Sequence, residues 1–149
     1  MLRVAKLTDY ATVVMAELAF RPQRVLSASE LAARAGLESA TVAKVLKPLA
    51  QAGLVEGIRG VHGGYRLARP AHAITLADIV EALEGPLAMT ACSTHGGRCD
   101  IEHSCNARGN WQYVNRIIDN ALRAVNLESM HAAPRATRRK AISAVLTEH

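Results

Sequence analysis

Apolar residues recur every three or four positions along most of the chain, the spacing that places them on one face of a helix. This pattern predicts a first helix over residues 8–20, with Thr8 as its N-cap. A second helix is predicted over residues 27–35, because Ser27 and Glu30 have the three-residue spacing of a capping box.

A third helix is predicted over residues 39–51, after a short turn that begins at Gly36. The apolar positions that keep the helical spacing there are Val42, Val45, Leu46 and Leu49. Pro48 interrupts the pattern, because proline lacks the N–H that bonds to the carbonyl four residues earlier. The sequence therefore predicts either a kink near Lys47 or an early end of this helix.

Two short β-prone runs follow at residues 54–59 and 65–68, separated by a glycine-rich turn over 60–64. This arrangement predicts a β-hairpin. A further helix is predicted over 75–83, with Thr75 as its N-cap. The order of helix, helix, turn, helix and hairpin is that of a winged helix-turn-helix. The predicted fold class is therefore mainly α, with a small β-hairpin as the wing.

The second half of the chain is organised differently. Residues 86–108 show little periodicity and are predicted to form a loop, whereas residues 110–127 are predicted to form the longest amphipathic helix. Residues 131–149 are small, basic and polar, which predicts a flexible tail. The boundaries are placed at 1–85 for the winged-helix domain, 86–109 for the loop, 110–130 for the long helix and 131–149 for the tail.

Composition supports a helical protein with a polyanionic partner. The chain has 149 residues, of which 27 are Ala and five are aromatic, and Ala is the best helix former. Residues 1–70 hold ten Lys and Arg against five Asp and Glu, a net charge of +5. Residues 71–130 hold four against seven, a net charge of −3, and the tail holds four against one. The basic first half favours nucleic acid as the partner.

Several classes of protein are excluded. Residues 1–20 carry four charged side chains and do not resemble a secretory signal. No run of eighteen apolar residues exists, so no membrane contact is expected and the protein is expected to be cytoplasmic. No P-loop, dinucleotide fingerprint or nucleophile elbow is present, so an enzyme is not expected.

The third predicted helix is the one that enters the major groove in a helix-turn-helix, with its N-terminal residues facing the bases. The candidate DNA-contacting residues are Ser39, Thr41 and Lys44 at the start of this helix, Lys47 one turn further along, and Arg59 and His62 at the tip of the hairpin. Hydroxyls and ammonium groups can contact base edges or phosphates. The simpler alternative is a solvated basic helix face beside an ordinary hairpin turn.

Three cysteines, Cys92, Cys99 and Cys105, lie within fourteen residues. Their spacings are wider than the tight pairs that hold zinc, and suit a larger group such as an iron–sulfur cluster, whose usual ligands are thiolates. His95 and His103 are weak candidates for a further ligand. The alternatives are three unliganded thiols, or one redox pair with a spare cysteine.

These residues resemble a known family. The segments that carry the resemblance are Lys6–Ala11, Ser27–Leu31, Arg59–Leu67 and Ile79–Pro86, together with the three cysteines. They are similar to the Rrf-two superfamily of winged-helix regulators, typified by the iron–sulfur cluster regulator and the nitric-oxide-sensing repressor. The resemblance extends through about residue 130, and Cys105–Trp111 looks most like the branch that regulates the SUF iron–sulfur assembly operon.

The resemblance implies a homodimer in which the helix over 110–127 pairs with its copy. Each recognition helix then enters one half-site of a double-stranded DNA operator. It also implies an iron–sulfur cluster bound by the three cysteines. The expected function is a dimeric transcription regulator, by expectation a repressor, which senses cluster status and controls iron–sulfur assembly genes.

The fourth cluster ligand is left open. Some members of the family supply a histidine three residues after the last cysteine, but here that position is Arg108, which does not coordinate iron. Others use an acidic residue from the first helix of the partner subunit, and the matching position is Asp9. Asp9 also suits the positive end of its own helix. Both 2Fe–2S and 4Fe–4S clusters therefore remain open.

Two alternative functions follow from the same residues. A nitric-oxide-sensing repressor would release DNA when its cluster is nitrosylated. A zinc-stabilised interaction module would bind one metal ion per chain and no DNA.

Overall fold

The computed structural model describes residues 3–90, 93, 99 and 104–132. Cys92 and most of the loop around the cysteines lie outside the described residues. The tail predicted over 131–149 also lies outside them from residue 133 onward.

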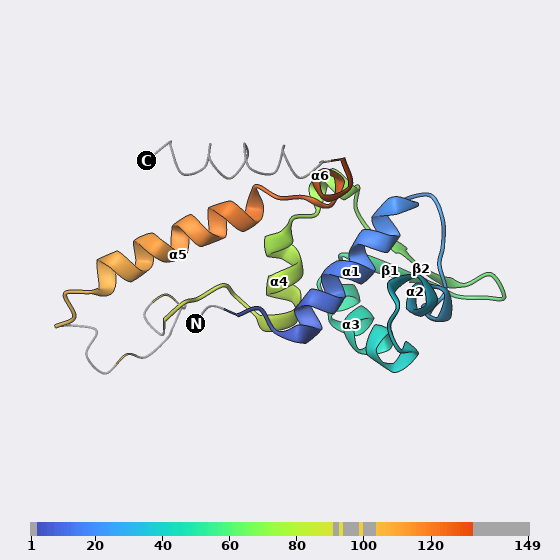
Figure 1. Ribbon diagram of the computed structural model, residues 1–149, viewed down its shortest axis with the longest axis horizontal. Coiled ribbons are helices and arrows are strands. Elements are labelled where there is room, and N and C mark those ends of the chain that lie inside the picture. Colours follow the sequence, from blue (N-terminus) through green and yellow to red (C-terminus); the bar gives the residue numbers. More distant parts are fainter. Residues whose placement is uncertain (1–2, 91–92, 94–98, 100–103, 133–149) are drawn as a thin grey trace.

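The structure is mainly helical, with a single antiparallel hairpin in its described part, which confirms the predicted fold class (Figure 1). In chain order, the elements are α1 Lys6–Phe20, α2 Ala28–Ala35, α3 Ser39–Gln51, β1 Val55–Ile58, β2 Gly64–Leu67, the short 3₁₀ turn η1 Ala71–Ala73, α4 Leu76–Glu84, α5 Arg108–Arg123 and α6 Leu127–Ala132.

The helix-turn-helix begins where the sequence predicts. The Ser27 hydroxyl accepts a hydrogen bond from the Glu30 amide at 3.1 Å, and the Glu30 carboxylate accepts one from the Ser27 amide at 2.8 Å. This pair is the predicted capping box. Gly36 ends α2 with a φ of +65°, a left-handed conformation that glycine adopts without steric cost.

The predicted start of the first helix is wrong by two residues. Ala5 is the N-cap of α1, and Thr8 lies inside the helix, where it is buried. The Thr8 hydroxyl donates a hydrogen bond of 2.6 Å to Glu84 at the end of α4, and the same Glu84 oxygen accepts one from the Ala5 amide at 3.1 Å. A carboxylate distant in sequence therefore caps the helix that Thr8 was predicted to cap.

Pro48 does not end the recognition helix early. Helix α3 continues through Pro48 to Gln51, because Val45, Leu46 and Leu49 on either side of the proline are buried in the core. Tertiary packing thus outweighs the hydrogen bond that Pro48 cannot donate.

The hairpin is held to the body of the protein by a third backbone segment. Strands β1 and β2 pair from Val55 with Leu67 to Ile58 with Gly64. Leu26 and Tyr65 exchange two backbone hydrogen bonds of 2.9 and 2.7 Å. A Cβ atom on Gly64 would lie 2.4 Å from the Leu26 carbonyl oxygen, so only glycine permits this close approach.

The core is formed where α1 packs against α2, α3 and α4, and where α3 packs against α2 and α4. The largest fully buried side chains are those of Met15, Leu18, Leu26, Leu31, Leu46, Leu49, Leu54, Ile74, Ile79, Leu127, Val14 and Val42. Thr75 and Asp78 form a second capping box at the start of α4, as the sequence predicts.

The long C-terminal helix ends earlier than predicted. Helix α5 stops at Arg123, and a separate helix, α6, begins at Leu127. The Asn126 carboxamide accepts a hydrogen bond from the Ser129 amide at 2.8 Å, which caps α6. The chain between the helices pairs with the segment before α4, because Val125 accepts a bond from the Leu76 amide and Leu127 donates one to Ile74.

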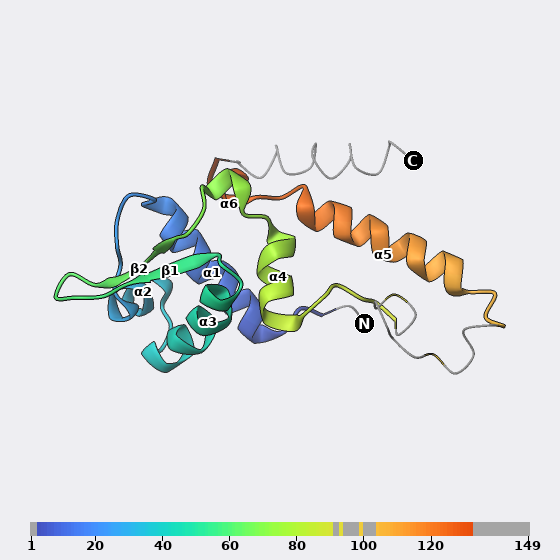
Figure 2. The ribbon, with the colours of Figure 1, turned by 180° about the vertical axis from the view of Figure 1, so that it is seen from behind.

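Figures 1 and 2 show that α5 leaves the winged-helix body on one side, whereas the hairpin projects on the opposite side. Helix α6 returns to the body, where Leu127 is buried and α6 packs against α1 and η1. Within the described part of the chain, no helix has the length and apolar character needed to cross a membrane.

Candidate functional site

Helix α3 presents a basic and polar face to solvent. Ser39, Lys44 and Lys47 are exposed, and Thr41 is half-buried. The opposite face carries the buried side chains of Val42, Val45, Leu46 and Leu49. Because the buried face fixes the rotation of α3 about its axis, the four candidate DNA-contacting residues of this helix are held toward the outside.

The tip of the hairpin is exposed as well. Arg59 and His62 are both exposed, and Val61 between them is 98% exposed. Further back on the hairpin, the Arg66 guanidinium is paired with the Glu56 carboxylate. The positive charge that the tip offers to a partner therefore comes from Arg59 rather than from Arg66.

The cysteine region begins directly after α4. Cys99 and Cys105 are half-buried and form no disulfide, and Cys92 lies outside the described residues. Among the described residues, no three Cys, His, Asp or Glu side chains lie close enough together to hold a metal ion. The described part of one chain thus does not by itself contain a complete metal site.

The Asn115 side chain on α5 holds the start of the loop. The Asn115 carboxamide oxygen accepts a hydrogen bond from the Met89 amide at 3.0 Å, and its nitrogen donates one to the Leu87 carbonyl at 3.2 Å. This asparagine thereby satisfies two backbone groups of a segment without regular structure. Asn115 therefore links the start of the loop directly to α5.

An ion-pair cluster joins α5 to α4. The Arg123 guanidinium lies 2.9 Å from the Asp119 carboxylate and 2.7 Å from the Glu81 carboxylate. Its hydrogen bond with Asp119 raises the pKa of Arg123 above the ordinary value. Because these side chains are between 29% and 45% exposed, each pair contributes less than about 1 kcal/mol to stability. The cluster links the C-terminal end of α5 to α4.

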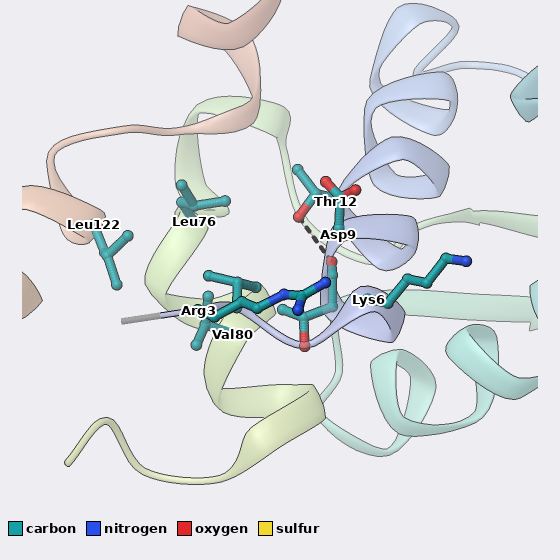
Figure 3. A pocket seen from close by; sticks show the side chains of 9 residues that line it. Arg3, Lys6, Asp9, Thr12, Leu76, Val80 and Leu122 are labelled. Carbon is teal, nitrogen blue, oxygen red and sulfur yellow. Dashed lines mark hydrogen bonds between the residues drawn. The ribbon is translucent and has the colours of Figure 1, made fainter. Parts of the chain in front are cut away.

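Asp9 lies in the first turn of α1, at the edge of an open cavity of about 390 Å³. Figure 3 shows Asp9 and Thr12 on one side of this cavity, and Leu76, Val80 and Leu122 on the other. Leu122 belongs to the C-terminal end of α5, whereas Cys105 precedes its first residue. At 1.5 Å per residue, the fourteen residue steps from Arg108 to Leu122 span about 21 Å. Because Asp9 shares the cavity with Leu122, it lies near the C-terminal end of α5, whereas Cys105 of the same chain lies near the N-terminal end.

Helix α5 buries none of its residues completely within the chain. The predicted apolar face is partly covered, since Ile117, Ile118 and Leu122 are half-buried. Its N-terminal half is open, with Trp111 44% and Val114 37% exposed. An uncovered apolar face is typical of an amphipathic helix that packs against a partner surface.

Sequence reasoning missed three residues that hold this region together. Glu84 caps α1, Asn115 holds the loop, and Arg123 joins α5 to α4. No local signal predicts these contacts, because each joins residues that lie between 26 and 79 positions apart in the sequence. By contrast, the N-caps that the sequence predicts at Ser27 and Thr75 are both confirmed, because each depends only on residues three positions apart.

The fold and the exposed basic surface define a winged helix-turn-helix DNA-binding protein. A sequence model of the Rrf2 family, described as an iron-dependent transcriptional regulator, matches residues 4–133. The chain therefore belongs to the Rrf2 family of transcriptional regulators. This confirms the resemblance to the Rrf-two superfamily, whereas the resemblance of Cys105–Trp111 to the SUF branch stays a prediction.

Known proteins of similar sequence and structure agree with this assignment. Protein aau3 of Rhizobium meliloti (strain 1021) is 38% identical over 105 residues, which cover 70% of this chain and 68% of that protein. The structure of CymR, the global cysteine regulator of B. subtilis, is similar with a TM-score of 0.72 and 28% identity, and covers 87% of this chain and 96% of that one. The IscR structure of T. potens gives a TM-score of 0.68 and 26% identity, and covers 91% and 96%.

Proposed function

We propose that this protein binds operator DNA through α3 and the hairpin. Ser39, Thr41 and Lys44 contact base edges or phosphates in the major groove, and Lys47 contacts a phosphate one turn further along. Arg59 and His62 at the hairpin tip contact the adjacent backbone or minor groove. All of these residues except the half-buried Thr41 are exposed, on a module whose other face packs into the core, and this placement supports the proposal.

We propose that the functional unit is a homodimer formed through α5. Trp111, Tyr113 and Val114 expose apolar surface along its N-terminal half, and the chain itself supplies nothing to cover it in the described region. Pairing of α5 with its copy would remove this surface from water. Two copies also present two recognition helices, which is the arrangement that a two-fold symmetric operator requires.

We propose that Cys92, Cys99 and Cys105 hold an iron–sulfur cluster, of the 2Fe–2S or the 4Fe–4S type. The donor chemistry fits, because thiolates are the usual ligands of such clusters and the two described cysteines are free, half-buried thiols. When bound, the cluster would supply a redox-active centre held by the loop that connects α4 to α5.

Asp9 of the partner subunit is the proposed fourth ligand. Its carboxylate is exposed at the edge of the cavity beside α5, about one helix length away from Cys105 of its own chain. An antiparallel or crossed pairing of two α5 helices brings the cysteine end of one chain toward α1 of the other. The separation within one chain therefore favours a ligand from the second copy.

The function that the site supports best is a dimeric transcription regulator, by expectation a repressor, whose cluster status controls its affinity for the operator. The proposed target genes are those of iron–sulfur assembly. Within the Rrf2 family, the proposed relatives are the regulators of the SUF operon. The observation that carries this proposal is the direct connection between the winged-helix domain and the cysteine loop. The cysteine loop begins at the end of α4, beside the Glu84 carboxylate that caps α1, and is fastened to α5 by Asn115.

The test is purification without oxygen, followed by counts of iron and sulfide and a DNA-shift assay with and without the cluster. We expect iron, sulfide and visible absorbance in the protein, and different operator affinities for the two forms. Equal affinities would remove the sensing claim. DNA binding by a protein that takes up no iron would instead favour a thiol-based regulator, and release of DNA at low doses of nitric oxide would favour a nitric-oxide sensor.

A further inference from the structure

The outward face of α3 carries small apolar side chains among the basic ones. Ala40, Ala43, Lys44 and Lys47 are all exposed, and their spacing of three, four and seven residues places them along one stripe. The stripe lies opposite the buried residues Val42 and Leu46. It is therefore the surface that α3 offers to the floor of a major groove.

This stripe offers two lysines that can bind guanine, but no arginine, asparagine or glutamine. Guanine is most often bound by arginine or lysine, and adenine by the carboxamide of asparagine or glutamine. From Ser39 to Lys47 the helix contains no arginine, asparagine, glutamine or acidic residue. Glu38 precedes the first turn as the N-cap. Base reading within the first two turns must therefore use hydroxyls, ammonium groups and the two methyl groups.

We infer that the Cβ methyl groups of Ala40 and Ala43 read thymine, by packing against the C5-methyl group that only thymine presents in the major groove. This inference rests on the proposed binding of DNA through α3. The short side chains allow the helix backbone to approach the bases closely, and each methyl contact excludes water from both partners. Ala40 and Ala43 are thus specificity-determining residues, and each half-site carries thymine opposite them.

A structural explanation of these alanines competes with the inference. Alanine is the best helix former, and other alanines such as Ala33 on α2 are exposed without a role in base reading. If Ala40 and Ala43 serve only helix stability, DNA affinity will depend on the helix and not on the thymine methyl group. The two explanations therefore differ in their response to a change in the DNA alone.

The experiment begins with selection of operators from a randomised duplex library by the wild-type protein. Each thymine of the selected half-site is then replaced by deoxyuridine, which keeps the hydrogen bonds of the base pair and removes only the methyl group. Loss of one buried methyl contact corresponds to about 0.8 kcal/mol, or about a fourfold loss of affinity for each half-site. We expect this loss at one or two thymines in the major groove facing α3.

Ala43→Gly removes the proposed partner methyl from the protein. We expect the variant to bind the thymine and deoxyuridine operators equally at the position that Ala43 contacts, because the methyl contact is already absent. Ala33→Gly is the matched control, since it weakens a helix by the same substitution away from the stripe. It should retain the fourfold discrimination of the wild-type protein.

The outcomes distinguish the inference about Ala40 and Ala43 from the proposed DNA-binding function. The protein could bind selected operators in a salt-sensitive way and yet respond to the loss of no thymine methyl group. That result overturns the inference that alanine reads thymine, and leaves the DNA-binding function intact. Equal discrimination by Ala43→Gly and the wild-type protein overturns the role of Ala43. Failure of the wild-type protein to select or bind any duplex overturns the proposed function together with this inference.

Discussion

Replacement of Lys47 by alanine should change how DNA binding depends on salt. Lys47 is exposed on α3, and no ion pair holds it within the described part of the chain. Its ammonium group is therefore available to a phosphate. Arg66 on the hairpin is the useful contrast, because its guanidinium is already paired with Glu56 and is less available to DNA.

The magnitude follows from counterion release. Each phosphate contact contributes about 0.9 to the slope of log affinity against log salt concentration. Because the proposed homodimer carries two copies of Lys47, the variant should lose about 1.8 from the slope. Between about 50 and 200 mM salt this change amounts to about tenfold, so the affinity gap between the two proteins is wide at low salt and narrow at high salt.

Fluorescence anisotropy with a labelled operator, measured over a series of salt concentrations, determines the slope. Lys47→Ala should give a shallower line than the wild-type protein, and Arg66→Ala should give a line closer to that of the wild type. Parallel lines for Lys47→Ala and the wild type would refute the phosphate contact. An equal change in slope for Arg66→Ala would refute the argument that its ion pair withholds it from DNA.

Four other outcomes are expected from single changes. Arg59→Ala should weaken operator binding in shift assays and leave cluster absorbance unchanged; loss of the cluster would show that Arg59 is structural. Leu127→Ala should cost about 2–5 kcal/mol in urea unfolding, because Leu127 is 1% exposed in the core, whereas Arg59→Ala should change stability by less than about 0.5 kcal/mol. Hydrogen bonds from Ser27 lower the pKa of Glu30, so the carboxylate's contribution to the free energy of unfolding is present above about pH 4.5 and is lost as the pH falls through the lowered pKa. In unfolding measurements over this pH range, Glu30→Gln should abolish the acid-sensitive part of the free energy of unfolding. Asp9→Ala should alter the visible and electron-paramagnetic-resonance spectra of the anaerobic protein, and unchanged spectra would exclude Asp9 as a ligand.

The winged-helix half of the chain was predictable because its signals are local. A capping box needs only residues three positions apart, as with Ser27 and Glu30, and a left-handed glycine such as Gly36 ends a helix wherever it stands. The buried face of α3 likewise follows from spacing alone. These short-range patterns fixed which side chains face outward, and hence the candidate DNA-contacting residues.

The C-terminal half was less predictable, because tertiary contacts decide its boundaries. Apolar spacing continues from α5 into α6, and backbone pairing with the segment at Ile74–Leu76 separates the two helices. The available signal was Asn126 with Ser129, a spacing typical of a helix start that the stronger apolar pattern obscured. Glu84 as the cap of α1 lies 79 residues from Ala5 and has no local signature.

The proposed cluster site was predictable only as a set of candidate residues. The spacing of Cys92, Cys99 and Cys105 identifies the candidate thiolates, but the proposed fourth ligand depends on how the two chains of the proposed homodimer pair. Sequence periodicity shows that α5 has an apolar face and contains no information on the angle at which two such faces cross.

The central claim is that cluster occupancy controls DNA affinity. It is tested most directly by titrating one selected operator with anaerobically purified protein, with the same protein after removal of its iron, and with Cys99→Ala. We expect two distinct dissociation constants for the loaded and iron-free forms, with Cys99→Ala matching the iron-free form. A single dissociation constant for all three proteins would contradict it.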